Sequence, residues 1–384
     1  MKRVAILGST GSIGKNALRV AQALRDQVEV VVLAANSSTE LLAEQARTFQ
    51  CLNLVLSDRS SRNAMEKESL PAGCKVSYGP EALVEAACRE DVDMVLCSIV
   101  GTAGLLPVIR AIQAGKEIAL ASKEVLVMAG SLVMDLVKKH NTKLIPVDSE
   151  HSAIFQCLYS LDSSKTAKII LTCSGGPFRN TPVEEMNNAD FTRAVAHPVW
   201  SMGQKISVDS ASLVNKALEM VEAHFLFDCP EERIDVLIHP QSVIHSMIEF
   251  PDGGVLAQLG VPDMRLPIQL AYTWPERVGG GLEKLSLAKV GRLEFFEVDT
   301  VKFPAVTFAR NAIREGGTLG CVLNAANEVA FDRFKAGLIR FGQIPQIIEK
   351  TMFAHKNCKE MSMSLEGILE ADRWARAYAS GLNV

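Results

Sequence analysis

Two acidic residues separated by one position stand in the stretch PVDSEHSAIF, which spans Pro146 to Phe155. Asp148 and Glu150 follow the run Lys143–Val147, whose apolar residues predict a strand. In an extended chain such residues point to the same side, where two carboxylates repel each other. Burying them unpaired is costly, so a bound cation would explain the pair, and a solvated strand end is the plainer alternative. A purely carboxylate site suits Mg²⁺ or Mn²⁺ and not zinc.

A glycine-rich stretch, ILGSTGSIGKNAL, places Gly8, Gly11 and Gly14 between the first expected strand and the first expected helix. A tight turn there lets backbone N–H groups approach a pyrophosphate at the helix N-terminus. The spacing is G-x-x-G-x-x-G, which is weak evidence by itself, and a ligand-free turn is the alternative. Its position at the start of an alternating strand–helix region strengthens the prediction of a dinucleotide site.

The end of the second expected strand bears on the choice of dinucleotide. Asn36, Ser37 and Ser38 follow it, and no acid precedes Glu40. NAD-specific sites usually carry an acid here for the ribose 2′-hydroxyl, so NADP is favoured. Neither Lys nor Arg stands in this stretch, so hydroxyl and amide groups would have to hold the 2′-phosphate.

The elements that position these residues follow from the apolar pattern. The first 150 residues alternate strand-like and helical segments, which predicts a parallel, doubly wound sheet of the Rossmann type. Strands are expected at Val4–Leu7, Val28–Ala35, Leu52–Leu56, Val92–Ser98, Glu117–Ala121 and Lys143–Val147, and helices at Lys15–Leu24, Thr39–Thr48, Ala82–Arg89, Leu105–Ala114 and Glu124–Lys139.

The pattern then changes to that of an α+β domain with a more open sheet. Strands are expected at Ala167–Cys173, Val236–Ile238, Val243–Phe250 and Val255–Leu259, without regular helices between them, and helices at Ala305–Arg314, Leu323–Phe334, Ile344–Ala354 and Leu365–Tyr378. We therefore expect an α/β protein with a cofactor domain at 1–146, a catalytic domain at 147–274, a linker at 275–299 and a helical domain at 300–384.

Composition excludes several classes of protein. The 384 residues carry a net charge of −4, so no basic face for nucleic acid is expected. The apolar runs are too short to span a bilayer, and no room for a leader precedes the first strand. Nine scattered cysteines, with no C-x-x-C pair, indicate free thiols in a reducing compartment, the cytoplasm.

Six motifs in order resemble the 1-deoxy-D-xylulose 5-phosphate reductoisomerase family. They are GSTGSIG at 8–14, ASKE at 121–124, PVDSEH at 146–151, HPVWSMGQKISVDSASLVNKALEMVEA at 197–223, LIHPQSVIHSMIEF at 237–250 and LGVPDMRLPI at 259–268. The resemblance implies conversion of 1-deoxyxylulose 5-phosphate to 2-C-methylerythritol 4-phosphate with NADPH and a divalent cation. It also implies a homodimer. The reaction combines a rearrangement with a hydride transfer, and a retro-aldol path and a direct ketol shift both remain open.

The resemblance also implies the site residues. The metal ligands would be Asp148, Glu150 and Glu219, joined by Lys123 and His197 in the catalytic set. The phosphate of the sugar would contact Ser174, Ser210, Asn215 and Lys216. Ser149 would also contact the substrate, and Trp200 would cover it as part of a lid. The cofactor would contact Gly8, Thr10, Gly11, Ser12, Ile13, Gly14, Asn36, Ser37, Ser38, Ser122, Glu124, Gly203 and Met264.

Some of these positions also have plainer explanations. The spacing of Asn215, Lys216 and Glu219 places all three on one helix face. Glu222 is as well explained by a helix salt bridge as by a place near the site. The family often has Lys or Arg where this chain has Ser37, and some members have Asn where it has Ser122. Both departures concern cofactor contacts.

Two readings from other classes compete. A different NADP-dependent dehydrogenase, acting on a hydroxy acid, would explain the glycine stretch but not the phosphate-binding serines. A regulator that binds NADP without turnover would leave Asp148, Glu150 and Glu219 unexplained.

Overall fold

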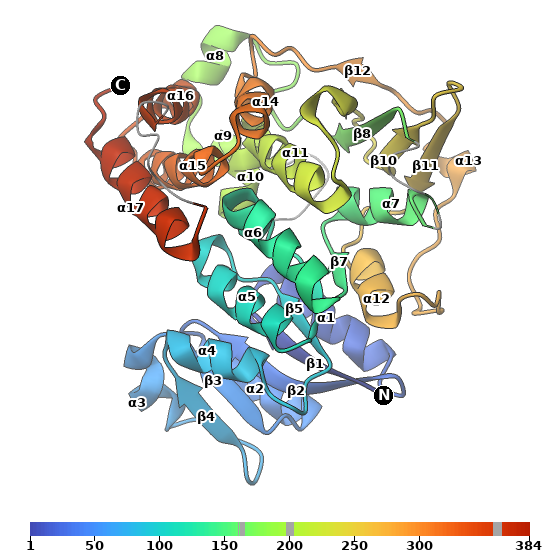
Figure 1. The fold of residues 1–384 in the computed structure, drawn as a ribbon, viewed down its shortest axis with the longest axis vertical. Helices are drawn as coiled ribbons and strands as arrows, with labels where there is room; N and C mark the ends of the chain where they lie inside the picture. The colour runs from blue at the N-terminus through green and yellow to red at the C-terminus, as the bar shows by residue number, and fades with distance from the viewer. Residues whose placement is uncertain (160, 162–165, 197–202, 356–362) are drawn as a thin grey trace. The chain divides into compact units, whose positions relative to one another are not determined.

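The computed structural model describes residues 1–159, 161, 166–196, 203–355 and 363–384 (Figure 1). The chain forms two compact units. The first comprises Met1–Val125, Val133–Ser152 and Asp263–Glu283, and the second comprises Leu126–Leu132, Ala153–Pro262 and Lys284–Val384. Three of the five divisions fall within helices, two in α6 (Glu124–His140) and one in α7 (Ser149–Cys157).

The first unit is built on a seven-stranded parallel sheet in the order β4-β3-β2-β1-β5-β6-β7. The strands are β1 (Lys2–Leu7), β2 (Val28–Ala35), β3 (Asn53–Leu56), β4 (Lys75–Tyr78), β5 (Met94–Cys97), β6 (Glu117–Leu120) and β7 (Leu144–Pro146). All four residues of β5 are completely buried. Parallel strands covered on both faces need such continuous apolar runs, and the doubly wound prediction is confirmed.

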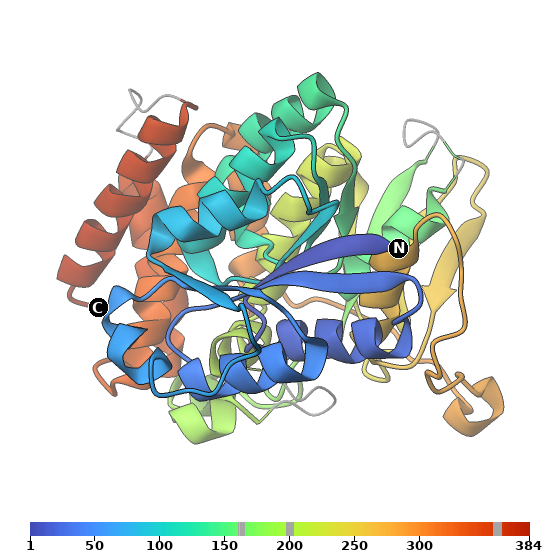
Figure 2. The ribbon, with the colours of Figure 1, turned by 90° about the horizontal axis from the view of Figure 1, so that it is seen from below.

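Helices cover both faces of this sheet. Figure 2 shows the deep-blue helices on one face and the lighter blue and cyan helices on the other. They are α1 (Ser12–Ala23), α2 (Thr39–Phe49), α3 (Arg62–Met65), α4 (Pro80–Ala87), α5 (Leu105–Gln113) and α12 (Arg265–Thr273).

The sequence did not predict the edge strand β4 or helix α12 of the first unit, nor the short helix α3. The edge strand β4 alternates exposed and half-buried residues, so it lacks the apolar run of the central strands. Helix α12 comes from a segment more than a hundred residues beyond β7, yet it packs against α1, β6 and β7. Its buried residues include Ile268, Leu270, Ala271 and Tyr272.

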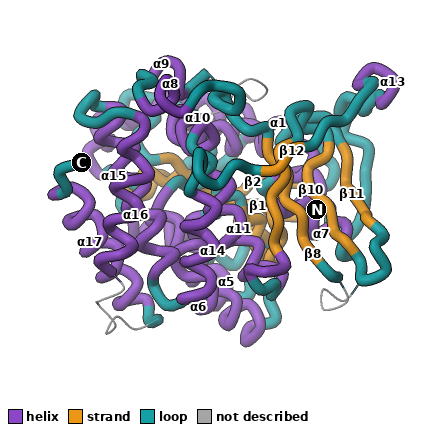
Figure 3. Tube along the Cα trace, turned by 90° about the horizontal axis from the view of Figure 1, so that it is seen from above, coloured by secondary structure: helices purple, strands orange, loops and turns teal. Residues whose placement is uncertain are grey.

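The second unit contains a five-stranded mixed sheet in the order β11-β10-β8-β9-β12. Its strands are β8 (Lys168–Cys173), β9 (Ile234–Ile238), β10 (Ile244–Glu249), β11 (Val255–Leu259) and β12 (Phe296–Glu297). Figure 3 shows β8, β10 and β11 side by side. Ile170, Ile244 and Met247 form a buried cluster on this sheet, with Leu237, Ala257 and Leu259 packed against it.

The expectation that no regular helices separate these strands is wrong for β8 and β9. These two strands are parallel, and a parallel pair requires a crossover connection, which is usually helical. The connection contains α8 (Val183–Asn187), α9 (Phe191–Ala194), α10 (Gln204–Ala211) and α11 (Val214–Phe227), followed by a 3₁₀ turn, η4 (Glu231–Arg233).

The four expected C-terminal helices are confirmed, and together they form the orange-to-red group in Figure 1. They are α14 (Ala305–Glu315), α15 (Leu319–Lys335), α16 (Ile344–His355) and α17 (Leu365–Gly381), and a short helix, α13 (Leu287–Val290), lies in the expected linker. Within the described residues, no helix combines the length and apolarity needed to cross a membrane. The eight cysteines in the same ranges have free thiols.

Candidate functional site

The glycine turn connects β1 directly to α1. Gly8 has a φ of +91°, which favours glycine, and a Cβ there would lie 2.8 Å from the Ser98 carbonyl oxygen. At Gly14 a Cβ would lie only 2.2 Å from the Gly8 carbonyl oxygen. Helix and turn can therefore approach this closely only because both residues lack a side chain.

Two buried polar side chains fix the same turn. The Ser9 hydroxyl donates to Gln45 Oε1 at 2.8 Å, and Gln45 Nε2 donates to the Ser9 carbonyl at 3.0 Å. Gly11 caps α1, so the N–H groups of Ser12 and Ile13 stand in its first turn, where intrahelical acceptors are lacking. Thr10 precedes the cap. These features suit an anion such as a pyrophosphate.

The end of β2 presents small polar residues to solvent. Asn36, Ser37 and Ser38 are all exposed. The Asn36 side-chain oxygen accepts a hydrogen bond from the Ser57 hydroxyl at 2.8 Å, which links it to the end of the neighbouring strand β3. Ser38 caps α2. As the sequence indicates, the three residues include no carboxylate that would repel a 2′-phosphate.

Lys123 and Asp148 meet at the carboxyl ends of two neighbouring strands. Lys123 follows β6, Asp148 follows β7, and the two strands pair in parallel. The ammonium Nζ lies 2.5 Å from Asp148 Oδ2, and Lys123 is only 6% exposed. Crevices outside the carboxyl ends of parallel strands are the usual place for a ligand.

The expectation that Asp148 and Glu150 lie in an extended segment is wrong. β7 ends at Pro146 and α7 begins at Ser149, so Asp148 precedes a helix and Glu150 lies in its first turn. One carboxylate oxygen of each nevertheless lies within 4.8 Å of the other. The Ser149 hydroxyl donates to Glu150 Oε2 at 2.5 Å. A helix start thus brings the two carboxylates together where a strand was predicted to do so.

Sequence reasoning gave His151 no role, yet it lies beside this pair. It is completely buried, and its Nδ1 is 4.0 Å from Asp148 Oδ2. The three-residue spacing at a helix start is the signal that would have found it.

Ser122 and Glu124 flank Lys123. The Ser122 hydroxyl is buried and donates to the Ile99 carbonyl at 2.6 Å. Glu124 is the first residue of α6 and is half-buried. Met264, the residue before α12, is also half-buried in this unit.

In the second unit, α11 gathers three polar side chains as its spacing predicted. Asn215 Nδ2 donates to Glu219 Oε1 at 2.5 Å, and Lys216 Nζ donates to Glu219 Oε2. Lys216 and Glu219 are 2% and 1% exposed. Lys and Glu are seldom buried this deeply, so the pair marks this helix face as a functional candidate.

Ser174 lies in a turn that abuts α10. Its hydroxyl accepts a hydrogen bond from the Gly176 N–H at 3.1 Å. Gly176 has a φ of +66°, and a Cβ there would lie 2.8 Å from the Ser210 carbonyl oxygen. The structure therefore brings the turn at Ser174 together with Ser210, two segments that the family resemblance assigned to one phosphate.

Lys302 secures the continuation of this turn. Its ammonium donates to the carbonyl oxygens of Phe178, Arg179 and Thr181 at 2.8, 2.9 and 2.6 Å. Burial lowers the pKa of Lys302, and Asp299 partly opposes this effect. Nothing in the local sequence signals this contact.

Two further predicted positions, His197 and Trp200, lie outside the described residues. Gly203 follows them as the exposed cap of α10. Of the proposed ligands, Asp148 and Glu150 belong to the first unit and Glu219 to the second.

Three family models match this chain in succession. Residues 4–130 match 1-deoxy-D-xylulose 5-phosphate reductoisomerase, residues 144–227 match its C-terminal domain, and residues 259–378 match the DXP reductoisomerase C-terminal domain.

Curated proteins and solved structures agree with these matches. The 1-deoxy-D-xylulose 5-phosphate reductoisomerase of Prosthecochloris aestuarii is 48% identical over 384 residues and all of both chains, and that of Chlorobaculum tepidum is 49% identical over 382 residues, likewise all of both chains. A Zymomonas mobilis structure of the enzyme in complex with NADPH is 41% identical, with a TM-score of 0.91 over 99% of this chain and 98% of that one.

A second structure, of DOX-P reductoisomerase in complex with NADPH, fosmidomycin and magnesium, is 39% identical, with a TM-score of 0.92 over the same shares. Full-length identity near one half, together with the three family models, leads to one conclusion: this chain belongs to the 1-deoxy-D-xylulose 5-phosphate reductoisomerase family.

Proposed function

We propose that the protein converts 1-deoxy-D-xylulose 5-phosphate to 2-C-methyl-D-erythritol 4-phosphate, using NADPH and a divalent cation, as an oxidoreductase of the non-mevalonate isoprenoid route. One observation carries the proposal: the same parallel sheet holds a dinucleotide-type glycine turn after β1 and a pair of adjacent carboxylates after β7. A reductase with a metal-assisted rearrangement needs both.

The metal ligands we propose are Asp148, Glu150 and Glu219. Carboxylate oxygens suit magnesium, and manganese is the alternative ion with the same preference. When bound, the ion supplies Lewis acidity that polarises a carbonyl and favours an ionised hydroxyl. Lys123 orients the Asp148 carboxylate from 2.5 Å, and the Ser149 hydroxyl does the same for Glu150. Asn215 and Lys216 hold both oxygens of Glu219.

The substrate phosphate would be held by Ser174, Ser210, Asn215 and Lys216. Two hydroxyls, an amide and an ammonium provide hydrogen-bond donors and one positive charge, which is the set that a phosphate requires. The glycine turn after Ser174 adds backbone N–H groups at positive φ, a conformation that favours anion binding. Ser149 would contact the remainder of the sugar.

The cofactor would lie on the glycine turn of the first unit, at Gly8, Thr10, Gly11, Ser12, Ile13 and Gly14. NADPH, when bound, supplies the hydride for the reduction. The exposed hydroxyls of Ser37 and Ser38, with the amide of Asn36, would receive the 2′-phosphate. Ser122, Glu124, Gly203 and Met264 complete the proposed contacts.

The remaining proposals rest on the family resemblance. His197 and Trp200 would belong to a lid over the substrate, and the protein would act as a cytoplasmic homodimer. Residues 1–146 would bind the cofactor, and residues 147–274 would bind the metal and the substrate. A linker at 275–299 would connect these to a helical domain at 300–384.

A coupled assay tests the function directly. NADPH oxidation is followed at fixed protein concentration with and without 1-deoxyxylulose 5-phosphate and Mg²⁺. We expect oxidation only when both are present, and formation of the branched product. Oxidation of NADPH by a keto acid in place of 1-deoxyxylulose 5-phosphate, or NADPH binding without turnover, would contradict the proposal.

A further inference from the structure

A buried hydrogen bond joins the C-terminal helix α15 to α10. Asn327 Nδ2 donates to Asp209 Oδ1 at 3.1 Å. Asn327 is 1% exposed and Asp209 is 5% exposed. Water has little access to this bond, so its loss would leave a buried carboxylate oxygen without that donor.

The second carboxylate oxygen of Asp209 is also engaged. Lys205, one turn earlier on α10, pairs with Oδ2. The Lys205 ammonium lies 5.7 Å from the ring centre of Phe331, within range of a cation–π contact. Because Asn327 and Phe331 are four residues apart on α15, one face of that helix holds both members of the Lys205–Asp209 pair.

Asp209 directly precedes a residue of the proposed phosphate site. α10 ends at Ala211 and α11 begins at Val214, with Leu213 at a φ of +58° between them. The Ser212 hydroxyl donates back to the Val208 carbonyl at 3.0 Å, which tightens the corner. A short, bonded corner transmits a displacement of Asp209 to Ser210 on one side and to the first turn of α11 on the other.

We propose that Asn327 is a positioning residue for the phosphate site, acting through Asp209. It touches neither substrate nor cofactor, and it fixes the helix corner that presents Ser210, Asn215 and Lys216. The C-terminal helical region thereby sets the geometry of phosphate binding. This inference rests on the proposed assignment of those three residues to the phosphate.

The chain offers a matched control one turn away on the same helix. Asn324 is also 1% exposed and its Nδ2 donates at 3.0 Å to Glu328, on α15 itself. Both Asn324→Ala and Asn327→Ala remove a buried amide and should lower the melting temperature similarly. We expect only Asn327→Ala to raise the KM for 1-deoxyxylulose 5-phosphate, roughly tenfold, as for one lost bond to a charged group. The Kd for NADPH should stay unchanged in both variants.

A reciprocal exchange provides a second test that does not depend on the alanine variant. Asn327→Asp places two carboxylates together and should raise KM more than tenfold. Adding Asp209→Asn restores one donor and one acceptor, so the double variant should recover most of the lost affinity. An equal KM increase in Asn324→Ala, an unchanged KM in Asn327→Ala, or no recovery in the double variant would each overturn the inference.

Ser210→Ala distinguishes the two possible failures. If it raises KM while Asn327→Ala does not, the phosphate assignment stands and only the positioning role is wrong. If neither change raises KM, although the unmodified protein turns over the substrate, both the assignment and the inference fail.

Discussion

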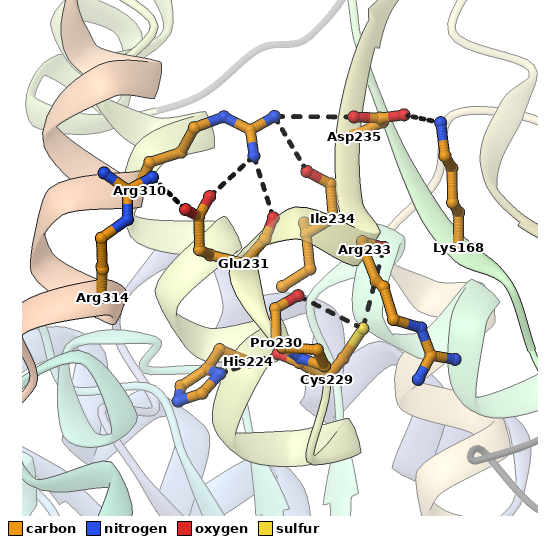
Figure 4. Close-up of polar contacts among 10 residues, drawn as sticks. All are labelled: Lys168, His224, Cys229, Pro230, Glu231, Arg233, Ile234, Asp235, Arg310 and Arg314. Atoms are coloured by element: carbon orange, nitrogen blue, oxygen red, sulfur yellow. Dashed lines mark hydrogen bonds and ion pairs between the residues drawn. The ribbon is translucent and has the colours of Figure 1, made fainter.

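Arg310 on α14 donates a hydrogen bond of 2.9 Å to the carboxylate of Glu231, a side chain that is only 5% exposed. Arg314, one turn further on α14, pairs with the other carboxylate oxygen. Arg310 also donates to the Ile234 carbonyl at 3.2 Å, at the start of β9 (Figure 4). The network ties α14 to η4 and β9 of the mixed sheet, so its charge state contributes to the stability of the second unit.

This network predicts an acid-dependent loss of stability. Burial alone would raise the pKa of the Glu231 carboxyl, but hydrogen bonds from Arg310 and Arg314 hold it below its ordinary value of 4.5. A folded-state pKa below the unfolded one stabilises the fold above pH 4.5, and that stability is lost as pH falls through the folded value. Glu231→Gln should therefore lower the melting temperature by roughly 5 °C at pH 7. The difference from the unmodified protein should shrink below pH 4.5.

The exposed neighbour Glu232 provides the control for that measurement. Glu232→Gln removes the same charge without touching a buried pair, so its melting temperature should stay within about 1 °C of the unmodified protein. A pH-independent difference for Glu231→Gln would contradict the linkage.

The geometry of the glycine turn predicts that alanine will be tolerated at position 11 but not at position 14. Gly14→Ala forces Cβ against the Gly8 carbonyl and should cost about 3 kcal/mol of stability. It should also weaken NADPH binding measured by fluorescence titration. Gly11→Ala places Cβ at an ordinary 3.4 Å from the same oxygen with φ at −73°, so thermal unfolding should show little loss. Equal destabilisation by both changes would refute this account of the turn.

Cofactor preference should respond to a charge at Ser37. Ser37→Asp adds a partner for a ribose 2′-hydroxyl and repels a 2′-phosphate, so the ratio of Kd values for NADH and NADPH should fall by roughly a hundredfold. Gln27→Glu is the control, because it adds the same charge just before the amino end of the same strand. Equal binding of NADH and NADPH by the unmodified protein would defeat the hypothesis.

The carboxylate assignment predicts separable effects on metal and cofactor. Glu219→Gln keeps one acceptor oxygen but removes a charge, so it should reduce turnover on the order of 10³-fold and weaken Mg²⁺ dependence. NADPH binding to the glycine turn should remain nearly intact. Asp148→Asn and Glu150→Gln should behave alike, and combining them should add little, since ligands of one ion act as a unit. Near-full activity of Glu219→Gln with unchanged Mg²⁺ dependence would show that these residues do not bind the metal.

The lid hypothesis concerns residues 196–204, most of which lie outside the described ranges. Saturating substrate, or a phosphonate hydroxamate inhibitor, should change tryptophan fluorescence and protect this segment from protease. Trp200→Phe should abolish the fluorescence change, because Trp200 is the tryptophan in the proposed lid. The fluorescence of Trp274 and Trp374 should remain as a constant background. A change that persists in Trp200→Phe would assign it to another tryptophan.

The sequence predicted secondary-structure elements correctly where the pattern of apolar residues fits only a helix or only a strand. The buried strands of the first sheet are continuous apolar runs, and the face shared by Asn215, Lys216 and Glu219 follows from helical spacing alone. The prediction from sequence was wrong where the local residue pattern is compatible with both a helix and a strand. Asp148 and Glu150 fit a strand end as well as a helix start, and the chain adopts the helix.

Contacts between distant segments could not be predicted. Asn327 and Asp209 are 118 residues apart, and neither residue type nor spacing marks them as partners. Their pairing depends on how α10 packs within the second unit, which only the three-dimensional structure supplies.

The bonds of Lys302 carry a consequence for biosynthesis. Its ammonium meets the carbonyl of Phe178 across 124 positions of sequence, so a nascent chain makes the turn after Ser174 long before the residue that secures it. Until Lys302 has left the ribosome, the Phe178 carbonyl can accept only the local N–H of Thr181, and the carbonyls of Arg179 and Thr181 lack the ammonium that binds them in the folded protein. Translation therefore supplies Gln45, the partner that fixes the glycine turn after β1, early in synthesis, whereas the segment around Ser174 reaches its final bonding only after about four-fifths of the protein has been made.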